Sequence, residues 1–161
     1  MKPIVIVQHE VGVAAGHFAS WLHARSLPHV AVNVHLGDAV PQSAERYAGL
    51  CSLGGNMSVN DPLPWVREEV ALMRDAVERG VPVIGHCHGG QLLARALGAE
   101  VTRNPCKEMG WLPVDVVDAA LVEEWLGSEV LGELFHWHGD AFSLPTGAHR
   151  LLSSRLTPNQ A

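Results

Sequence analysis

The sequence predicts an α/β fold in which a mainly parallel sheet carries helices on both of its faces, giving three layers. Short apolar runs rich in β-branched residues alternate with segments of helical periodicity, and this alternation is typical of β-α-β units. The 161 residues are 47 % hydrophobic and 17 % charged, so the chain can bury a sizeable core. We therefore expect one domain over residues 1–161, with its ligand site beyond the carboxyl ends of the strands.

The apolar pattern assigns the smaller elements in chain order. The expected strands lie at residues 4–7, 30–34, 50–53, 81–84, 114–117, 134–137 and 150–153. The expected short helices lie at residues 16–25, 92–97 and 121–126. The loops that matter for a ligand are then residues 8–12, 54–61, 85–91 and 136–142.

The clearest helix starts near Pro64 and stops at Gly80. Asp61 is expected to cap it, and a proline fits the first turn because that turn needs no N–H donor. The expected buried positions repeat at helical spacing and are Val66, Val70, Met73 and Val77.

Composition and charge exclude several classes of protein. Eleven Lys and Arg against 17 Asp and Glu give a net charge of −6, which argues against nucleic acid or an anionic membrane as the main partner. No apolar stretch approaches the roughly 20 residues of a membrane helix, and the first apolar run is too short for a signal peptide. Three cysteines indicate no disulfide framework, so we expect a reducing, cytoplasmic compartment.

Residues 85–89 read Gly-His-Cys-His-Gly, follow an apolar strand and open a helix, as a nucleophile elbow does. Such a turn holds its middle residue in a strained conformation, where the free N–H groups of the helix face it. For a thiol this environment lowers the pKa and favours the thiolate. We therefore expect Cys87 to be a catalytic nucleophile. The alternative is a buried core cysteine, which is our interpretation of Cys51 and Cys106.

Two adjacent glycines, Gly54 and Gly55, follow a different strand and should lie on the same rim as Cys87. The backbone there can expose an N–H group as an oxyanion donor. Taken alone, however, this segment favours a plain turn.

His136 and His138 alternate along an expected strand and so share one face, and Gly139 after them allows a close backbone approach. They are either ordinary polar residues at a strand end or part of a metal site, since the chain has ten histidines. No pair has the i, i+4 ligand spacing and the Cys/His spacing matches no zinc pattern, so we expect no metal and no other cofactor.

Together these segments resemble the class I, or triad-type, glutamine amidotransferase family, and most of all the stand-alone proteins similar to the amidotransferase part of GMP synthase. The residues that carry the resemblance follow one another along almost the whole chain, at 53–61, 64–65, 82–94, 107–111, 135–140 and 144–145. The resemblance implies a flavodoxin-like fold.

The resemblance also implies a role for each segment. Cys87 would attack the side-chain amide of glutamine and form a γ-glutamyl thioester, releasing ammonia, and water would then release glutamate. The backbone N–H groups of Gly55 and His88 would form the oxyanion hole. The implied substrate-binding residues are Gly54, Gln91, His138, Gly139 and Asp140.

The sequence departs from the family pattern at three places. Asn56 stands where the family has proline, and His88 stands where it has an apolar residue; a charged His88 would favour the thiolate. The family's His-Pro-Glu segment, which supplies the general base and its orienting carboxylate, does not occur in these residues. We therefore expect a chain truncated at the C-terminus, with little or no glutaminase activity. We also expect either poor stability or association into dimers, because a missing segment would expose core surface.

Two other functions stay open at this stage. One is a non-catalytic protein of the same architecture that binds an amino acid or a partner protein. The other is a cysteine hydrolase of the wider flavodoxin-like group that acts on another γ-glutamyl compound, or a redox sensor of that group. The expected small-molecule partner is glutamine or a γ-glutamyl compound, and a synthetase on another polypeptide would accept the ammonia.

Overall fold

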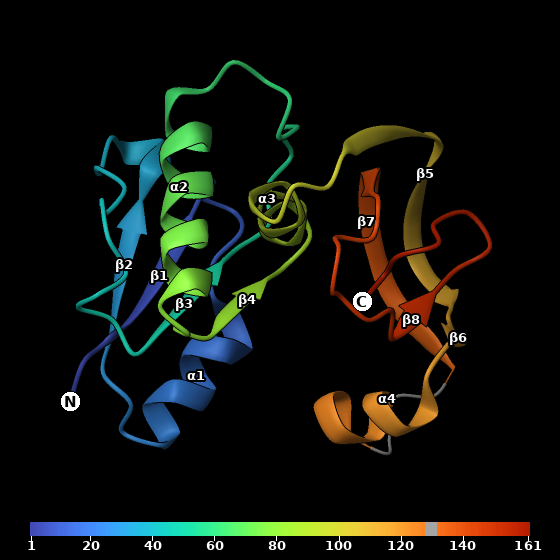
Figure 1. The fold of residues 1–161 in the computed structure, drawn as a ribbon, viewed down its shortest axis with the longest axis horizontal. Coiled ribbons are helices and arrows are strands. Elements are labelled where there is room, and N and C mark those ends of the chain that lie inside the picture. Colours follow the sequence, from blue (N-terminus) through green and yellow to red (C-terminus); the bar gives the residue numbers. More distant parts are fainter. Residues whose placement is uncertain (128–131) are drawn as a thin grey trace. The chain divides into compact units, whose positions relative to one another are not determined.

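The computed structural model describes residues 1–127 and 132–161, which form two compact units, Met1–Leu97 and Gly98–Ala161 (Figure 1). Each unit is described here by itself, and a single domain over the whole chain stays a prediction. No helix in the described residues is long and apolar enough to cross a membrane.

The first unit is built on a four-stranded parallel sheet with the strand order β2-β1-β3-β4. Its strands are β1 (Ile4–Gln8), β2 (His29–Asn33), β3 (Gly49–Ser52) and β4 (Val83–Gly85). The central strand pairs Ile6 with Ala31 on one side and with Cys51 on the other. The predicted parallel sheet is therefore confirmed, and its carboxyl rim carries the loops after β1, β3 and β4.

Helices cover both faces of this sheet, as the alternation of side chains along each strand requires. On one face α1 (Gly16–Ala24) buries Leu22 against Ile6, Cys51 and Leu53. On the other face α2 (Pro64–Glu78) lies beside α3 (His88–Ala96), and Ser52 of β3 points toward α2. A single 3-10 turn, η1 (Val34–Leu36), follows β2.

The helix α2 corrects two expectations. Its N-cap is Leu63 without a side-chain hydrogen bond, while Asp61 accepts the N–H of Ser58 at 2.9 Å, so the predicted cap is wrong. Val77, which the helical spacing predicts to be buried, is 42 % exposed. The buried positions of α2 are Val66, Glu69, Leu72, Met73 and Ala76. The inner face is rotated from the one predicted because it includes a glutamate whose carboxylate finds buried partners, which an apolar pattern cannot reveal.

The described residues of the second unit, 98–127 and 132–161, form two antiparallel strand pairs and a helix. A long ribbon joins β5 (Val101–Pro113) to β7 (Glu133–Phe142), with a bulge between Arg103 and Glu108. The short pair is β6 (Asp115–Val116) with β8 (Leu152–Ser153), and Asp118 caps α4 (Ala119–Leu126). The strand expected at 114–117 shrinks to β6, and the apolar pattern does not predict β5 because Pro105, Gly110 and charged residues interrupt it.

Truncation of Leu22 to alanine should lower the free energy of unfolding by about 2–5 kcal/mol, because Leu22 is fully buried between α1 and the sheet. Leu36, which is 71 % exposed, is the matched control and should change it by no more than about 0.5 kcal/mol. Urea unfolding of Leu22→Ala and Leu36→Ala measures both values, and equal losses would contradict the assigned core.

Candidate functional site

Cys87 lies at the tip of a bend between β4 and α3. It is the N-cap residue of α3 with φ +52°, and its side chain is exposed. A non-glycine residue in this region costs of order 1–3 kcal/mol and persists only where its surroundings enforce it. The elbow predicted from the sequence is therefore present, and Cys87 is not a buried core cysteine. Cys51 is buried as expected, whereas Cys106 is exposed.

Two glycines let the chain make this bend. A Cβ atom on Gly85 would lie 2.5 Å from the backbone of Gly89, and a Cβ atom on Gly89 would collide with the carbonyl oxygen of Ser52. Both contacts involve backbone atoms, which cannot move aside as a flexible side chain can. The amide of Gly89 also donates to the Leu53 carbonyl at 3.1 Å, so α3 begins in direct backbone contact with the end of β3.

The glycine pair lies beside the elbow, as its position after β3 predicts. A Cβ atom on Gly54 would lie 3.6 Å from the Cβ atom of Cys87. The N–H of Gly55 makes no backbone hydrogen bond among the residues described, and the N–H of His88 opens α3, where the helix supplies no acceptor. Two donors of the kind an oxyanion requires therefore stand in segments that meet at Cys87.

The side chain of His88 points into the unit and is only 1 % exposed. Burial and the neighbouring His9 lower the pKa of His88 to about 4, so the ring is neutral near pH 7. Within the described part of the chain neither ring nitrogen makes a hydrogen bond of ordinary length and angle, although a contact with the Met57 backbone acts to raise the pKa. A positive charge on His88 therefore does not contribute to a thiolate at Cys87, whereas the N-terminus of α3 favours one.

A buried polar network that the sequence does not reveal lies behind the glycine pair. His9, at the carboxyl end of β1, places Nε2 2.8 Å from Glu69 Oε2 and donates from Nδ1 to the Gly54 carbonyl at 3.2 Å. Ser52 Oγ donates to Glu69 Oε1 at 2.7 Å. Two features of the sequence could have revealed this network. Glu69 lies one turn from both Val66 and Met73 on the inner side of α2, and His9 lies in a loop that the topology places on the rim.

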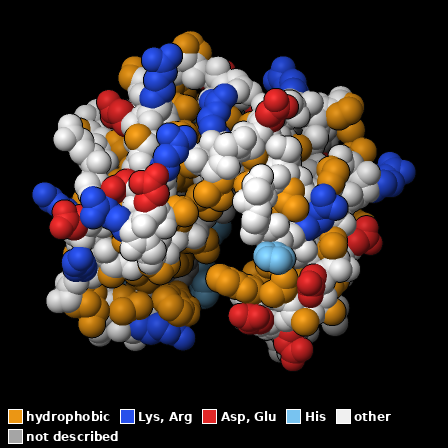
Figure 2. Space-filling view, in the orientation of Figure 1, with side chains coloured by type: hydrophobic (Ala, Val, Ile, Leu, Met, Phe, Trp, Pro, Cys, Tyr) orange, Lys and Arg blue, Asp and Glu red, His pale blue; other side chains and the backbone are white. Residues whose placement is uncertain are grey.

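Gln91 follows Cys87 by one helical turn, and the backbone N–H of Gln91 donates to the Cys87 carbonyl at 3.0 Å. Its side chain is only 6 % exposed. A hollow of about 570 Å³ lies beside the elbow and has mainly apolar walls, with Val13, Phe18, Trp21, Leu53, Gly54 and His86 among its lining residues. In Figure 2, hydrophobic side chains gather on the surface over α1, which provides part of this lining.

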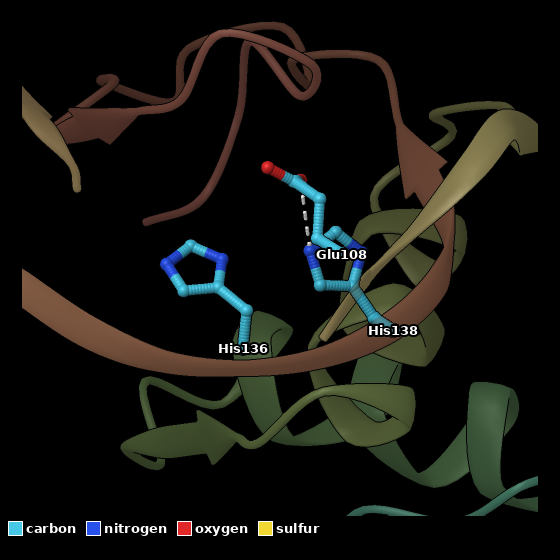
Figure 3. A group of neighbouring side chains, drawn as sticks. All are labelled: Glu108, His136 and His138. Carbon is cyan, nitrogen blue, oxygen red and sulfur yellow. Dashed lines mark ion pairs between the residues drawn. The ribbon is translucent and has the colours of Figure 1, made fainter. Parts of the chain in front are cut away.

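In the second unit, His136 and His138 point to the same side of β7, as predicted, and both lie near Glu108 of β5. Figure 3 shows the ion pair between Glu108 and His138, whose atoms are 3.2 Å apart, with the ring of His136 beside it. Burial raises the pKa of Glu108, but hydrogen bonds from Ser154 and Thr157 and the two histidines outweigh that effect and lower it overall. Burial lowers the pKa of His136.

These three residues have the donor set of a metal site, since one ligand atom from each lies within 4.8 Å of the others. The carboxylate is already engaged, however. Its Oε1 accepts from Ser154 at 2.6 Å, and its Oε2 accepts from Thr157 at 2.5 Å and from Gln160 at 2.8 Å. A metal would have to displace these donors, so the cluster fits a hydrogen-bonded core better than a metal centre.

Residues 138–140 were expected in a loop at 136–142, but they lie within β7 of the second unit, where His138 pairs with Glu108 and Asp140 pairs with Arg103, so the predicted loop is wrong. The Asp140 carbonyl accepts from His138 Nδ1 at 3.0 Å. A Cβ atom on Gly139 would lie 3.2 Å from Lys107 Cγ, so the aliphatic part of the lysine covers this glycine. Since the two units are described separately, a common site of Cys87 with His138, Gly139 and Asp140 stays a prediction.

Comparisons with known proteins match this chain to glutamine amidotransferases and to GMP synthases. Residues 19–157 match the family model described as glutamine amidotransferase class-I. The glutamine amidotransferase-like protein YfeJ of Salmonella typhimurium is 33 % identical over 96 % of the chain, and the GMP synthase of Aeropyrum pernix is 36 % identical over 72 % of it. The glutamine amidotransferase structure from Methylobacillus flagellatus is 42 % identical over 99 % of the chain with a TM-score of 0.95.

A glutamine amidotransferase structure from Thermotoga maritima is 27 % identical and has a TM-score of 0.86 over 98 % of the chain. The chain spans only part of each of these proteins. It covers 67 % of YfeJ, 64 % of the Methylobacillus protein and 21 % of the Aeropyrum GMP synthase. The expected α/β fold with its parallel sheet is confirmed by these structures.

Gly89→Ala should destabilise the chain by about 1–3 kcal/mol, because the added methyl group meets the Ser52 carbonyl. The direction is diagnostic, since helix propensity alone would favour alanine by about 1 kcal/mol. A Cβ atom on Gly12 would have no described atom within 4 Å, so Gly12→Ala is the control and should be nearly neutral. Urea unfolding of both variants tests this, and a stabilised Gly89→Ala would refute the contact.

Glu108→Gln should lower the free energy of unfolding by about 1–3 kcal/mol, because an NH₂ group replaces an oxygen that faces hydroxyl and amide donors. The folded state lowers the pKa of Glu108, so its contribution is complete above the ordinary carboxyl pKa and is lost as pH falls through the folded value. Unfolding measured against pH should thus show a smaller loss in acid for the variant. Exposed Glu133→Gln is the control.

Proposed function

Because the chain belongs to the class I glutamine amidotransferase family, we propose that Cys87 is the nucleophile of a glutaminase reaction. The observation that carries this proposal is an exposed cysteine at φ +52°, at the N-terminus of α3 and beside Gly54. The positive end of the helix favours the thiolate over the thiol. An ordinary core cysteine has none of these features.

The reaction proceeds in two steps. The Cys87 thiolate forms a bond to the side-chain carbonyl carbon of glutamine, and the carbonyl electron pair moves to oxygen. When that pair returns, the C–N bond breaks and the nitrogen leaves as ammonia after taking up a proton, which leaves a γ-glutamyl thioester. Water then attacks the thioester and releases glutamate and the thiol. The sum is glutamine plus water to glutamate plus ammonia.

The backbone N–H groups of Gly55 and His88 would hold the negative oxygen in both steps. Each belongs to a segment that meets at Cys87, and each is a fixed donor whose direction the backbone sets. Gly54, Gln91, His138, Gly139 and Asp140 are proposed to bind the remainder of glutamine.

We expect the chain itself to hydrolyse glutamine slowly or not at all. Its 161 residues contain no His-Pro-Glu segment, which the family uses to accept and return protons. Members of such a triad act as a unit, so a nucleophile without its base loses most of the rate enhancement. Any ammonia released would pass to a synthetase that accepts it, and dimer formation stays a prediction.

The apolar hollow beside Gly54 and His86 favours one second candidate. Ammonia, the leaving group from glutamine, needs no apolar surroundings, whereas a larger amine could use them. A γ-glutamyl compound with an apolar amine would place its γ-carbonyl at the same cysteine. The second candidate function is therefore hydrolysis of such a compound by the same two steps.

Alkylation tests the proposed nucleophile within one molecule. Iodoacetamide at about pH 6 should modify Cys87 at least about tenfold faster than Cys106, which is also exposed but belongs to a strand, β5, and not to the start of a helix. Buried Cys51, whose pKa is raised to about 12 by burial and by Glu69, should stay unmodified. Peptide mapping by mass spectrometry reads all three sites. Equal rates at Cys87 and Cys106 would remove the basis of the proposal.

Glutamate release by the purified chain tests the expected weakness of the reaction. Cys87→Ser is the blank, because it keeps the elbow and removes the thiol. The chain should release glutamate only slightly faster than this blank, because its 161 residues contain no His-Pro-Glu segment to transfer protons. A rate comparable with that of a full-length relative would contradict this part of the proposal.

A further inference from the structure

We propose that His9 is a positioning residue that holds the peptide between Gly54 and Gly55 in the orientation needed for the oxyanion hole. The inference rests on the proposed function, since it concerns the donor that Gly55 would supply. His9 does not touch the reacting atoms in this account. It acts through the backbone of the glycine pair.

The hydrogen bonds of His9 fix which groups donate. A carbonyl oxygen only accepts, so the contact of 3.2 Å with Gly54 requires a proton on His9 Nδ1. Glu69 Oε1 accepts from Ser52 at 2.7 Å, and Glu69 Oε2 stands 2.8 Å from His9 Nε2. The ring is therefore tied at both ends, to Gly54 through Nδ1 and to Glu69 through Nε2.

The bond to Gly54 controls the next N–H group because the peptide unit is planar. No cis peptide occurs among the described residues, so the C=O of Gly54 and the N–H of Gly55 point in opposite directions. Fixing the oxygen on the buried side directs the N–H away from that side. Two consecutive glycines have little conformational restraint of their own, so this direction needs an external partner.

Aromatic contacts keep the His9 ring in place. Trp65 stacks on it with centroids 5.0 Å apart, and His88 meets it edge-on at the same distance. Trp65 also meets His88 edge-on at 5.7 Å. The residue that supplies the second proposed N–H donor, His88, thus packs on the residue that orients the first. One buried cluster therefore sets both donors.

A purely stabilising role explains this cluster poorly. The side chains of His9 and Glu69 are completely buried, and buried charged pairs often stabilise a protein no better than apolar residues of similar size. What an apolar pair could not provide is a donor for the Gly54 carbonyl. The specific consequence of the pair is thus the orientation of one peptide.

Two variants of His9 separate positioning from packing. The amide nitrogen of Asn lies about where Nδ1 lies, so His9→Asn keeps a donor for Gly54, whereas the longer Gln reaches Glu69 and leaves Gly54 without one. Both variants lose the imidazole ring and its stacking on Trp65. They should therefore lose similar amounts of stability but differ in the proposed oxyanion site.

The readout is the rate at which a chloroketone analogue of glutamine labels Cys87, compared with the rate at which iodoacetamide alkylates the same residue. Attack on the ketone places negative charge on its oxygen, whereas alkylation by iodoacetamide needs only the thiolate. His9→Gln should lower the chloroketone rate about tenfold or more and leave the iodoacetamide rate within about twofold, and His9→Asn should recover most of the loss. Urea unfolding of each variant gives the matching change in stability.

The outcomes separate the two proposals. If the wild-type chain is not labelled by the chloroketone, the proposed function fails and the inference fails with it. If the wild-type chain is labelled and both variants lose rate alike, or His9→Gln loses none, only the positioning role is overturned. Long-range ¹H–¹⁵N NMR of the wild-type chain needs no variant, and an unprotonated His9 Nδ1 would also overturn it.

Discussion

The contact between the backbone of Gly89 and the carbonyl of Ser52 is the constraint on which the rest of the first unit depends. Because no side chain fits between them, α3 starts directly against the end of β3, and the chain must bend sharply after β4. Cys87 is the residue left at that bend, in a left-handed conformation and exposed. Its position is thus a consequence of packing between a strand and a helix, and the surroundings outweigh the local strain.

Buried polar groups behind the elbow connect the bend at Cys87 with the glycine pair. Ser52 contributes its carbonyl to the contact with Gly89 and its hydroxyl to Glu69, and Glu69 in turn engages His9. One residue of β3 therefore connects the bend at Cys87 with the support of the glycine pair. The rim of the sheet behaves as one linked structure, in which each backbone donor of the proposed site has a named physical support.

In the second unit, buried polar groups hold the C-terminal segment against the ribbon of β5 and β7. Its ribbon leaves a carboxylate, Glu108, on the buried side, and hydroxyl, amide and imidazole groups from β7 and the C-terminal segment surround it. The net effect of these donors is a lowered pKa despite burial. The arrangement ties the residues after β8 to the ribbon, which explains how a segment with little regular structure is held.

Much of the architecture was predictable from the sequence, because strand and helix periodicity, glycine at the bend and the order of the segments are local properties of the chain. The elbow at Cys87, the glycine pair beside it and the parallel sheet followed from them. The buried face of α2, the burial of neutral His88 and the strand β5 did not. Their cause is partner groups distant in sequence: His9 meets Gly54 and Glu69 across 45 and 60 positions, respectively. Local pattern determines where a chain bends and which residues favour burial, but only tertiary contact decides which polar groups find partners inside, because the cost of burying them depends on those partners.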